Sequence, residues 1–267
     1  PSDILARTRC GSPNYPTWEM FFDGSDVGFD GNLRDFAVLN DGVSSGRGAI
    51  IISTEATEAI PGFGKLVGQD LALFRPATIG NDTTGWFYRY FDASDVGLTL
   101  ASERIDTVAV HPINGDLMLG TVGNATVPAW TAADEDILLF HPSSLGTTTA
   151  GTWGFFFDGS DVGLGSLDVQ SATLRRPYFS SPMGTLLVSL DKSASPTGWV
   201  TPTTEMVMCH NGVFGPATSC QWRLQSGSIW ELDDPGMTAI DGHDYGTFMW
   251  PGGGLAVAAE SDWSDTK

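Results

Sequence analysis

The stretch Phe22-Asp23-Gly24-Ser25-Asp26-Val27-Gly28 decides how this chain is organised, because it recurs along the sequence. It returns as Phe91-Asp92-Ala93-Ser94-Asp95-Val96-Gly97 and as Phe157-Asp158-Gly159-Ser160-Asp161-Val162-Gly163, and a degraded copy stands at Leu224-Gln225-Ser226-Gly227-Ser228-Ile229. The copies are 69, 66 and about 69 residues apart. Repetition at a nearly fixed period indicates that one supersecondary unit was copied four times.

Each of the first three copies contains four short apolar runs separated by turn residues, which is typical of β-strands, and the fourth copy contains the first three of these runs. An aromatic run leads into the motif, a second run follows it, a third begins after a glycine, and a fourth begins with a carboxylate. In one copy these runs are residues 87–91, 105–110, 115–120 and 136–140. No segment combines a sustained 3.6-residue apolar period with helix caps, so we expect almost no helix.

The fourth copy ends without its fourth run, and a matching run stands at the start of the chain. Asp3-Ile4-Leu5-Ala6-Arg7 has the pattern of Asp136-Ile137-Leu138-Leu139-Phe140. Four-stranded units arranged radially, with the N-terminal strand closing the last unit, form a four-bladed β-propeller without an open seam. The rival arrangement is an open array in which this strand completes the last unit of a neighbouring molecule and so builds a filament.

The sequence therefore predicts a single all-β domain over residues 1–267, with four repeats of about 67 residues and four strands in each. The expected parts are a closing strand of the last blade within 1–17, then blades at 18–86, 87–152, 153–221 and 222–267.

These repeats resemble those of uncharacterised bacterial proteins that are predicted to be secreted or attached to the cell surface. The resemblance covers essentially the whole chain and implies such a location, but it implies no activity. The fourth copy departs from the pattern because Gln225-Ser226-Gly227-Ser228 lacks both acidic residues.

Composition excludes some classes of partner. The chain has 13 Lys plus Arg against 32 Asp plus Glu, a net charge of −19, which repels nucleic acid and anionic lipid surfaces. No apolar run approaches the roughly 18–20 residues that span a bilayer, so no direct membrane insertion is expected. Abundant Gly, Thr, Ser and aromatic residues with few Lys are typical of extracellular β-rich proteins. We therefore expect an extracellular or cell-surface location, with the periplasm also open.

Cysteine spacing points in the same direction. Cys209 and Cys220 bracket a loop that could bring them together as a local disulfide, which favours an oxidising compartment. Two buried thiols in a reduced protein are the alternative. Cys10 is left over, either free or paired between chains.

The repeated motif is a candidate metal site. Hard oxygen ligands gathered on a glycine-containing turn suit Ca²⁺, which takes 6–8 oxygens and tolerates irregular geometry. The candidate ligands are the turn residues of each copy and an acid at the start of the run that follows it: Asp23, Ser25, Asp26 and Asp35; Asp92, Ser94, Asp95 and Asp106; Asp158, Ser160, Asp161 and Asp168.

Two other interpretations compete with calcium. Asp and Ser also hydrogen-bond their own turn backbone, so a repeated turn needs these residues whatever else it does. Alternatively, Asp35, Asp106 and Asp168 could face one another around the axis of the propeller, in a channel filled by water or cations.

Catalytic patterns are weak in this sequence. His111 and His141 each precede a proline, which is typical of a turn, and no zinc spacing or nucleophile elbow is present. Asp241-Gly242-His243-Asp244 could supply a base with its orienting acid. Paired carboxylates would suit a glycosidase, although any two acids can be paired in so acidic a chain.

Aromatic residues divide into framework and candidates for binding. Trp18, Phe87, Trp153 and Trp222 share one repeat position, which is typical of core between repeats. Three tryptophans lie outside the pattern and are candidates for a surface that binds a sugar or a protein partner: Trp86, Trp230 and Trp250.

The sequence thus favours a secreted or cell-surface binding or structural module, which Ca²⁺ could stabilise and whose partner is a protein or a carbohydrate. Catalysis is not the first expectation. One alternative is an extracellular, glycosidase-like hydrolase with carboxylates at the channel mouth. Another is a subunit of a larger assembly, joined by donor-strand exchange.

Overall fold

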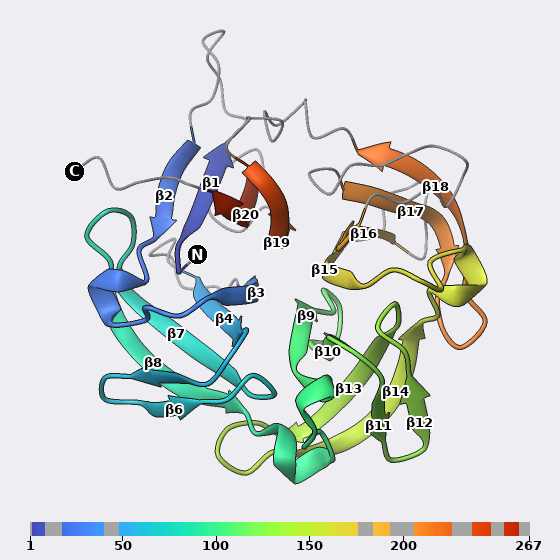
Figure 1. The fold of residues 1–267 in the computed structure, drawn as a ribbon, viewed down its shortest axis with the longest axis horizontal. Helices are drawn as coiled ribbons and strands as arrows, with labels where there is room; N and C mark the ends of the chain where they lie inside the picture. The colour runs from blue at the N-terminus through green and yellow to red at the C-terminus, as the bar shows by residue number, and fades with distance from the viewer. Residues whose placement is uncertain are drawn as a thin grey trace, which may run out of the picture.

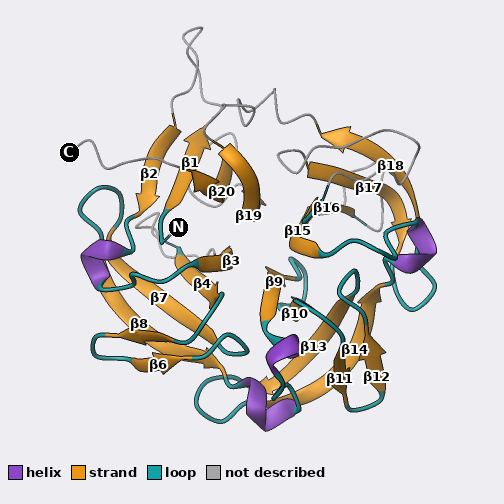
Figure 2. Ribbon diagram, viewed as in Figure 1, coloured by secondary structure: helices purple, strands orange, loops and turns teal. Residues whose placement is uncertain are grey.

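A computed structural model describes residues 2–8, 18–39, 48–175, 184–192, 206–225, 237–246 and 254–261. Strands dominate these ranges, and the helical elements are four short 3₁₀ turns, shown in purple in Figure 2. The turns are η1 (Ser25–Val27), η2 (Ala93–Val96), η3 (Ala101–Glu103) and η4 (Ser160–Val162). The all-β prediction is confirmed. Within the described ranges, no helix has the length and apolar character needed to cross a membrane.

Sixteen of the strands form four antiparallel sheets of four strands each. The first sheet is β3 (Leu33–Leu39), β4 (Ala49–Thr54), β7 (Leu71–Thr78) and β8 (Thr84–Phe91); the second is β9 (Ile105–Val110), β10 (Leu117–Thr121), β13 (Ile137–Ser144) and β14 (Ala150–Phe157). The third is β15 (Val169–Arg175), β16 (Thr185–Leu190), β17 (Met206–Val213) and β18 (Ser219–Gln225); the fourth is β19 (Met237–Gly246), β20 (Gly254–Ser261), β1 (Ile4–Thr8) and β2 (Trp18–Phe22).

Two small hairpins are inserted between the second and third strands of the first two sheets. They are β5 (Glu58–Ile60) with β6 (Gly64–Leu66), and β11 (Ala125–Val127) with β12 (Trp130–Ala132).

The fourth sheet joins the two ends of the chain. β1 pairs with β20 through Leu5 and Val257, and with β2 through Leu5 and Met20. The predicted pairing of the N-terminal strand with the last sheet is thus present. Ile4 and Ala6 are buried in this sheet.

The sheets group the strands differently from the expected blades at 18–86, 87–152, 153–221 and 222–267. An aromatic strand such as β8 or β14 is the last strand of a sheet whose other three strands precede it in the chain. The first aromatic strand, β2, belongs to the fourth sheet, where it lies next to β1. The reason is the connection: a short hairpin joins β7 to β8, whereas the motif turn that follows β8 carries the chain over to the next sheet.

The first strands of the four sheets lie nearest the centre of the molecule (Figure 1). β3 contacts β9, β9 contacts β15, β15 contacts β19 and β19 contacts β3. The outer strands β2, β8, β14 and β18 lie at the periphery (Figure 1).

Each main core cluster lies between two neighbouring sheets. Ile4 and Phe22 of the fourth sheet pack with Ile52 and Phe74 of the first. The first and second sheets share a cluster that includes Phe91 and Phe140, and the second and third share one that includes Met118 and Val188. Sheet-on-sheet burial of this kind follows from strands that carry apolar side chains on both faces.

The predicted disulfide is confirmed: Cys209 on β17 is bonded to Cys220 on β18. It links the two outer strands of the third sheet. A disulfide-bonded pair fits an oxidising compartment. Cys10 lies outside the described residues.

Candidate functional site

The motif forms the same turn in all three complete copies. The serine hydroxyl donates to the first aspartate of its motif at 2.7 Å, as in Ser25 to Asp23 Oδ1, Ser94 to Asp92 Oδ1 and Ser160 to Asp158 Oδ1. The final glycine, for example Gly28 with φ of 72°, is in the left-handed region, where a side chain would be strained. The sequence of the motif therefore encodes a compact 3₁₀ turn.

Each turn is tied to a threonine in the outer hairpin of the following sheet. Thr83 N–H donates to Asp26 Oδ2 at 2.9 Å, and Asp23 N–H donates to Thr83 Oγ1 at 3.0 Å. The Thr83 hydroxyl also donates to the carbonyl of Gly80 at 2.8 Å. We call this arrangement the threonine latch.

The threonine latch is repeated. Thr149 bonds in the same way to Asp95, Asp92 and Gly146, and Thr218 to Asp161, Asp158 and Gly215. Because each turn follows one sheet and each threonine belongs to the next, the latch ties consecutive sheets together. The sequence reasoning missed these threonines, although Gly-x-x-Thr at residues 80–83, 146–149 and 215–218 was a usable signal.

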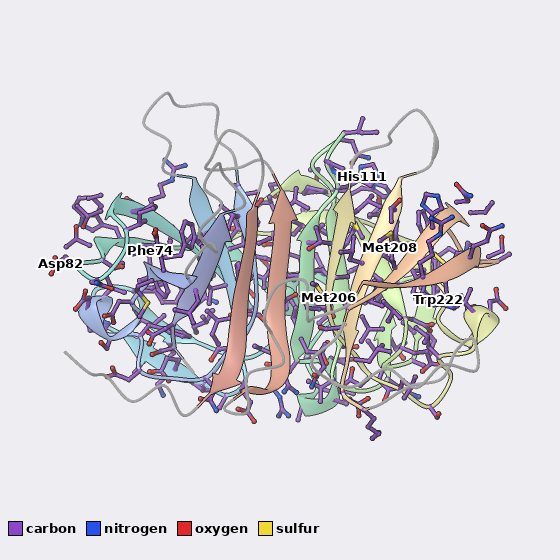
Figure 3. All side chains as sticks on the ribbon, turned by 90° about the horizontal axis from the view of Figure 1, so that it is seen from above. Phe74, Asp82, His111, Met206, Met208 and Trp222 are labelled. Carbon is purple, nitrogen blue, oxygen red and sulfur yellow. A yellow bond between two sulfur atoms is a disulfide. The ribbon has the colours of Figure 1, made fainter. Side chains whose placement is uncertain are left out.

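In two of the three latches, a tryptophan side chain also hydrogen-bonds to the motif turn. The indole N–H of Trp222 donates to the carbonyl of Val162 at 2.9 Å, and that of Trp153 donates to Val96 at the same distance. Trp222 lies at the periphery beside η4 (Figure 3). The repeated tryptophan is therefore part of the framework.

A second repeated contact fixes the start of each turn. The N–H of Gly24, Ala93 and Gly159 donates to Oδ1 of Asp3, Asp70 and Asp136 respectively, at 2.9–3.0 Å. Asp3, at the N-terminal end of the chain, thus does for the fourth sheet what Asp70 and Asp136 do for the first and second. These hydrogen bonds are separate from the strand pairing of β1, and both observations place the N-terminal segment in the fourth sheet.

These contacts bear on the calcium prediction. The first and second acids of each motif already accept hydrogen bonds from the protein, as Asp23 and Asp26 do. Among the described residues, no three or more His, Cys, Asp or Glu side chains are grouped so as to hold a metal ion. The geometry favours the turn interpretation of the motif, and calcium binding stays a prediction.

Asp35 lies among the innermost strands and links three of them. It sits on β3 and is fully buried; its Oδ2 accepts from the backbone N–H of Val108 on β9 at 2.6 Å. Its Oδ1 accepts from the hydroxyl of Ser171 on β15 at 2.8 Å. The side chain of Asp35 therefore links β3, β9 and β15 near the centre of the molecule.

The acids Asp35, Asp106 and Asp168 are not structural equivalents, contrary to the prediction. The first strands of the three sheets can be aligned by the residues that they pair with on the second strands. In this alignment, Asp35 occupies the same position as Thr107 and Ser171, and Asp106 the same position as Arg34 and Gln170. Counting from the motif fails here because the segment between turn and strand differs in length among the copies.

Asp106 and Asp168 nonetheless interact. Asp106 is fully buried. Burial, and then the neighbouring charge of Asp168, raise the pKa of Asp106 well above its ordinary value. Burial, together with the charges of Asp191 and Asp134, raises the pKa of Asp168 to about 7, although a hydrogen bond with Asp106 and the charge of Arg34 lower it.

This pair predicts a pH-dependent stability. Because folding raises the pKa of Asp168 from 3.8 to about 7, the folded state holds the proton more tightly, and the contribution is lost as pH rises through 7. The free energy of unfolding should therefore fall between pH 5 and pH 8. Asp106→Asn should reduce that fall, because it removes a fully buried carboxyl group whose own pKa is raised well above its ordinary value; urea denaturation at both pH values measures the change. Asp82→Asn, at an exposed loop position, is the control; a fall in Asp106→Asn as large as in the parent would contradict the assignment.

One histidine has an acidic partner. His141 Nδ1 lies 2.6 Å from Asp116 Oδ2, which also accepts from the Asn114 amide at 2.5 Å. His141 lies within β13 and not in the turn that the following proline suggested. No serine or cysteine nucleophile contacts this pair in the described part of the chain.

The candidate binding tryptophans have different outcomes. Trp86 on β8 is 64% exposed, and Tyr88, two residues along the same strand, is 50% exposed. Trp230 and Trp250 lie outside the described residues, as do the side chains of Asp241, His243 and Asp244.

No protein-family model, curated protein or solved structure matches this chain.

Proposed function

We propose that the chain is a four-bladed β-propeller that works outside the cell as a carbohydrate-binding module. Each four-stranded sheet is a blade, and β1 and β2 complete the blade begun by β19 and β20. The contacts that run from β3 through β9, β15 and β19 back to β3 support this architecture. A filament joined by strand exchange would use the same pairing of β1 with β20, but between neighbouring molecules.

The observation that carries the binding function is the outward aromatic pair on β8. Trp86 and Tyr88 are two residues apart on an extended strand, so their side chains project from the same face about 7 Å apart. Large aromatic side chains that remain this exposed on a soluble protein commonly mark an interaction site.

The blade framework does not require these aromatics. In register with the neighbouring strand, Trp86 corresponds to Thr152 on β14 and to Gln221 on β18. Tyr88 corresponds in the same way to Gly154 and Arg223. One blade therefore carries an aromatic surface where two others, with the same backbone, carry small or polar side chains.

The chemistry of this surface favours a carbohydrate over a protein partner. A stable protein interface buries about 800 Å² on each side around a contiguous apolar centre. The other exposed large apolar side chains of the described residues, Leu100, Ile113 and Val213, lie on other segments of the chain. Two planar rings bordered by Thr78, Thr84 and Arg75 instead suit stacking against sugar rings whose hydroxyls need polar partners.

The location outside the cell is supported by two features. They are the Cys209–Cys220 disulfide and the low lysine content of an acidic chain.

Trp86→Ala should weaken binding to an immobilised polysaccharide by about tenfold or more, because stacking and burial of one aromatic ring contribute about 1–3 kcal/mol. Affinity electrophoresis across a panel of neutral and acidic polysaccharides measures this. Thr152→Ala, at the corresponding position of the next blade, should leave binding unchanged. Binding that is insensitive to Trp86→Ala, or absent across the panel, would refute the proposed function.

A hydrolase is the second candidate, because burial raises the pKa of Asp168, which directly precedes the inner strand β15, to about 7, a value that suits a general acid. Its partner Asp106 is fully buried and cannot touch a substrate in this conformation. Release of reducing ends from the polysaccharides of the same panel, and its loss in Asp168→Asn, would favour this candidate.

A further inference from the structure

Arg75 extends the aromatic pair on the first blade. Its position on β7 is directly opposite Trp86 on β8, and its guanidinium carbon lies 5.8 Å from the centre of the Tyr88 ring. The side chain is exposed. Stacking of this kind orients the planar guanidinium group beside the two rings.

The same position carries a histidine in the next two blades, where it has a partner. His141 in the second sheet contacts Asp116, and His210 in the third contacts Thr185 Oγ1 at 3.3 Å. The antiparallel register places Ala49 at the corresponding position opposite Arg75. Ala49 offers no polar side-chain atom, so the first blade leaves its cation without this partner.

Within the described ranges, Arg75 forms no ion pair with a carboxylate. The nearby Arg89 differs, because it pairs with Asp70 and donates to the carbonyl of Lys65. Among the described residues, the guanidinium group of Arg75 is thus exposed beside two exposed aromatic rings and forms no ion pair with an acid. Its five N–H donors form a fork that fits a carboxylate in a bidentate manner.

We infer that the aromatic surface binds an acidic carbohydrate, in which sugar rings stack on Trp86 and Tyr88 while a carboxylate is held by Arg75. This inference rests on the proposed carbohydrate-binding function. The ligand carries few negative charges, because a net charge of −19 repels a densely charged polyanion over about 8–10 Å at physiological ionic strength.

The experiment compares three immobilised polymers: a neutral polysaccharide, one with a carboxylate on a minority of its sugars, and a densely sulfated one. The parent protein should bind the sparsely carboxylated polymer best and the densely sulfated polymer least. Arg75→Gln should lower affinity for the carboxylated polymer about tenfold to hundredfold, the range for a hydrogen-bonded charge, and leave the neutral polymer unaffected. Arg75→Lys should recover only part of the loss, because an ammonium group cannot form the bidentate contact.

Arg223→Gln is the matched control, because it removes the same charge from an exposed site on β18. It should leave all three affinities unchanged. If Trp86→Ala abolishes binding but Arg75→Gln does not distinguish the polymers, the acidic ligand is refuted and the carbohydrate module stands. If the sulfated polymer binds best, the sparse-charge assignment is overturned. If no polymer binds, both proposals fail.

Discussion

Deletion of residues 1–8 should abolish the cooperative unfolding transition of the whole protein. β1 is an interior strand of the fourth sheet and pairs with both β20 and β2. Its removal exposes two strand edges and the space filled by Ile4 and Ala6. Loss of Ile4 burial costs about 1.5–3 kcal/mol, and each ladder hydrogen bond about 0.5–1.5 kcal/mol. Together these losses are comparable to the total stability of a typical domain, about 5–15 kcal/mol.

Urea denaturation followed by circular dichroism measures this effect. A synthetic peptide of residues 1–8, added to the deletion variant, should restore the transition by occupying the open position between β20 and β2. A deletion variant that unfolds at the same urea concentration as the parent would contradict closure by β1.

The second large effect is expected from breaking the three threonine latches together. Thr83→Val, Thr149→Val and Thr218→Val keep the shape of each side chain but remove the hydroxyl that serves an aspartate N–H and a glycine carbonyl. All three threonines are buried. Unsatisfied buried groups cost about 1–3 kcal/mol at each site, and distant sites add. The triple variant should therefore lose about 3–9 kcal/mol of unfolding free energy.

Thr126→Val provides the control, since Thr126 is an exposed β11 residue. Its unfolding free energy should stay within about 0.5 kcal/mol of the parent value, as for most surface substitutions. Single variants that each lose less than this amount would show that the latches do not stabilise the joints between sheets.

Much of the fold could be predicted from the sequence because the repeat was visible in it. The period located four units, the matching pattern at Asp3-Ile4-Leu5 located the strand that joins the two ends, and the spacing of Cys209 and Cys220 located the disulfide. The period does not show at which strand each sheet begins. Which strand begins a sheet depends on the length of each connection, so the aromatic strands were assigned to the wrong neighbours.

The role of the motif could be predicted only in part. Asp, Ser and Gly in one turn indicated local hydrogen bonds, and these are present. The bonds to Thr83, Thr149 and Thr218 join residues 54–60 positions apart, and such pairing depends on how the sheets pack. The motif therefore had the composition of a metal loop, while its acids serve joints between sheets. Trp86 was identified because it breaks the repeat; Arg75 was missed because its significance depends on Ala49 across the ladder.

The most direct test of the closed arrangement is a cysteine crosslink between the two ends of the chain. β1 and β20 place Ala6 opposite Ala256, where cross-strand Cβ atoms are about 4.5–5.5 Å apart and small adjustments allow a disulfide. Ala6→Cys with Ala256→Cys, in a Cys10→Ser background, should be oxidised within single molecules and remain monomeric on non-reducing electrophoresis at every protein concentration. Crosslinking that yields only dimers and higher oligomers, in proportion to concentration, would contradict closure within one chain.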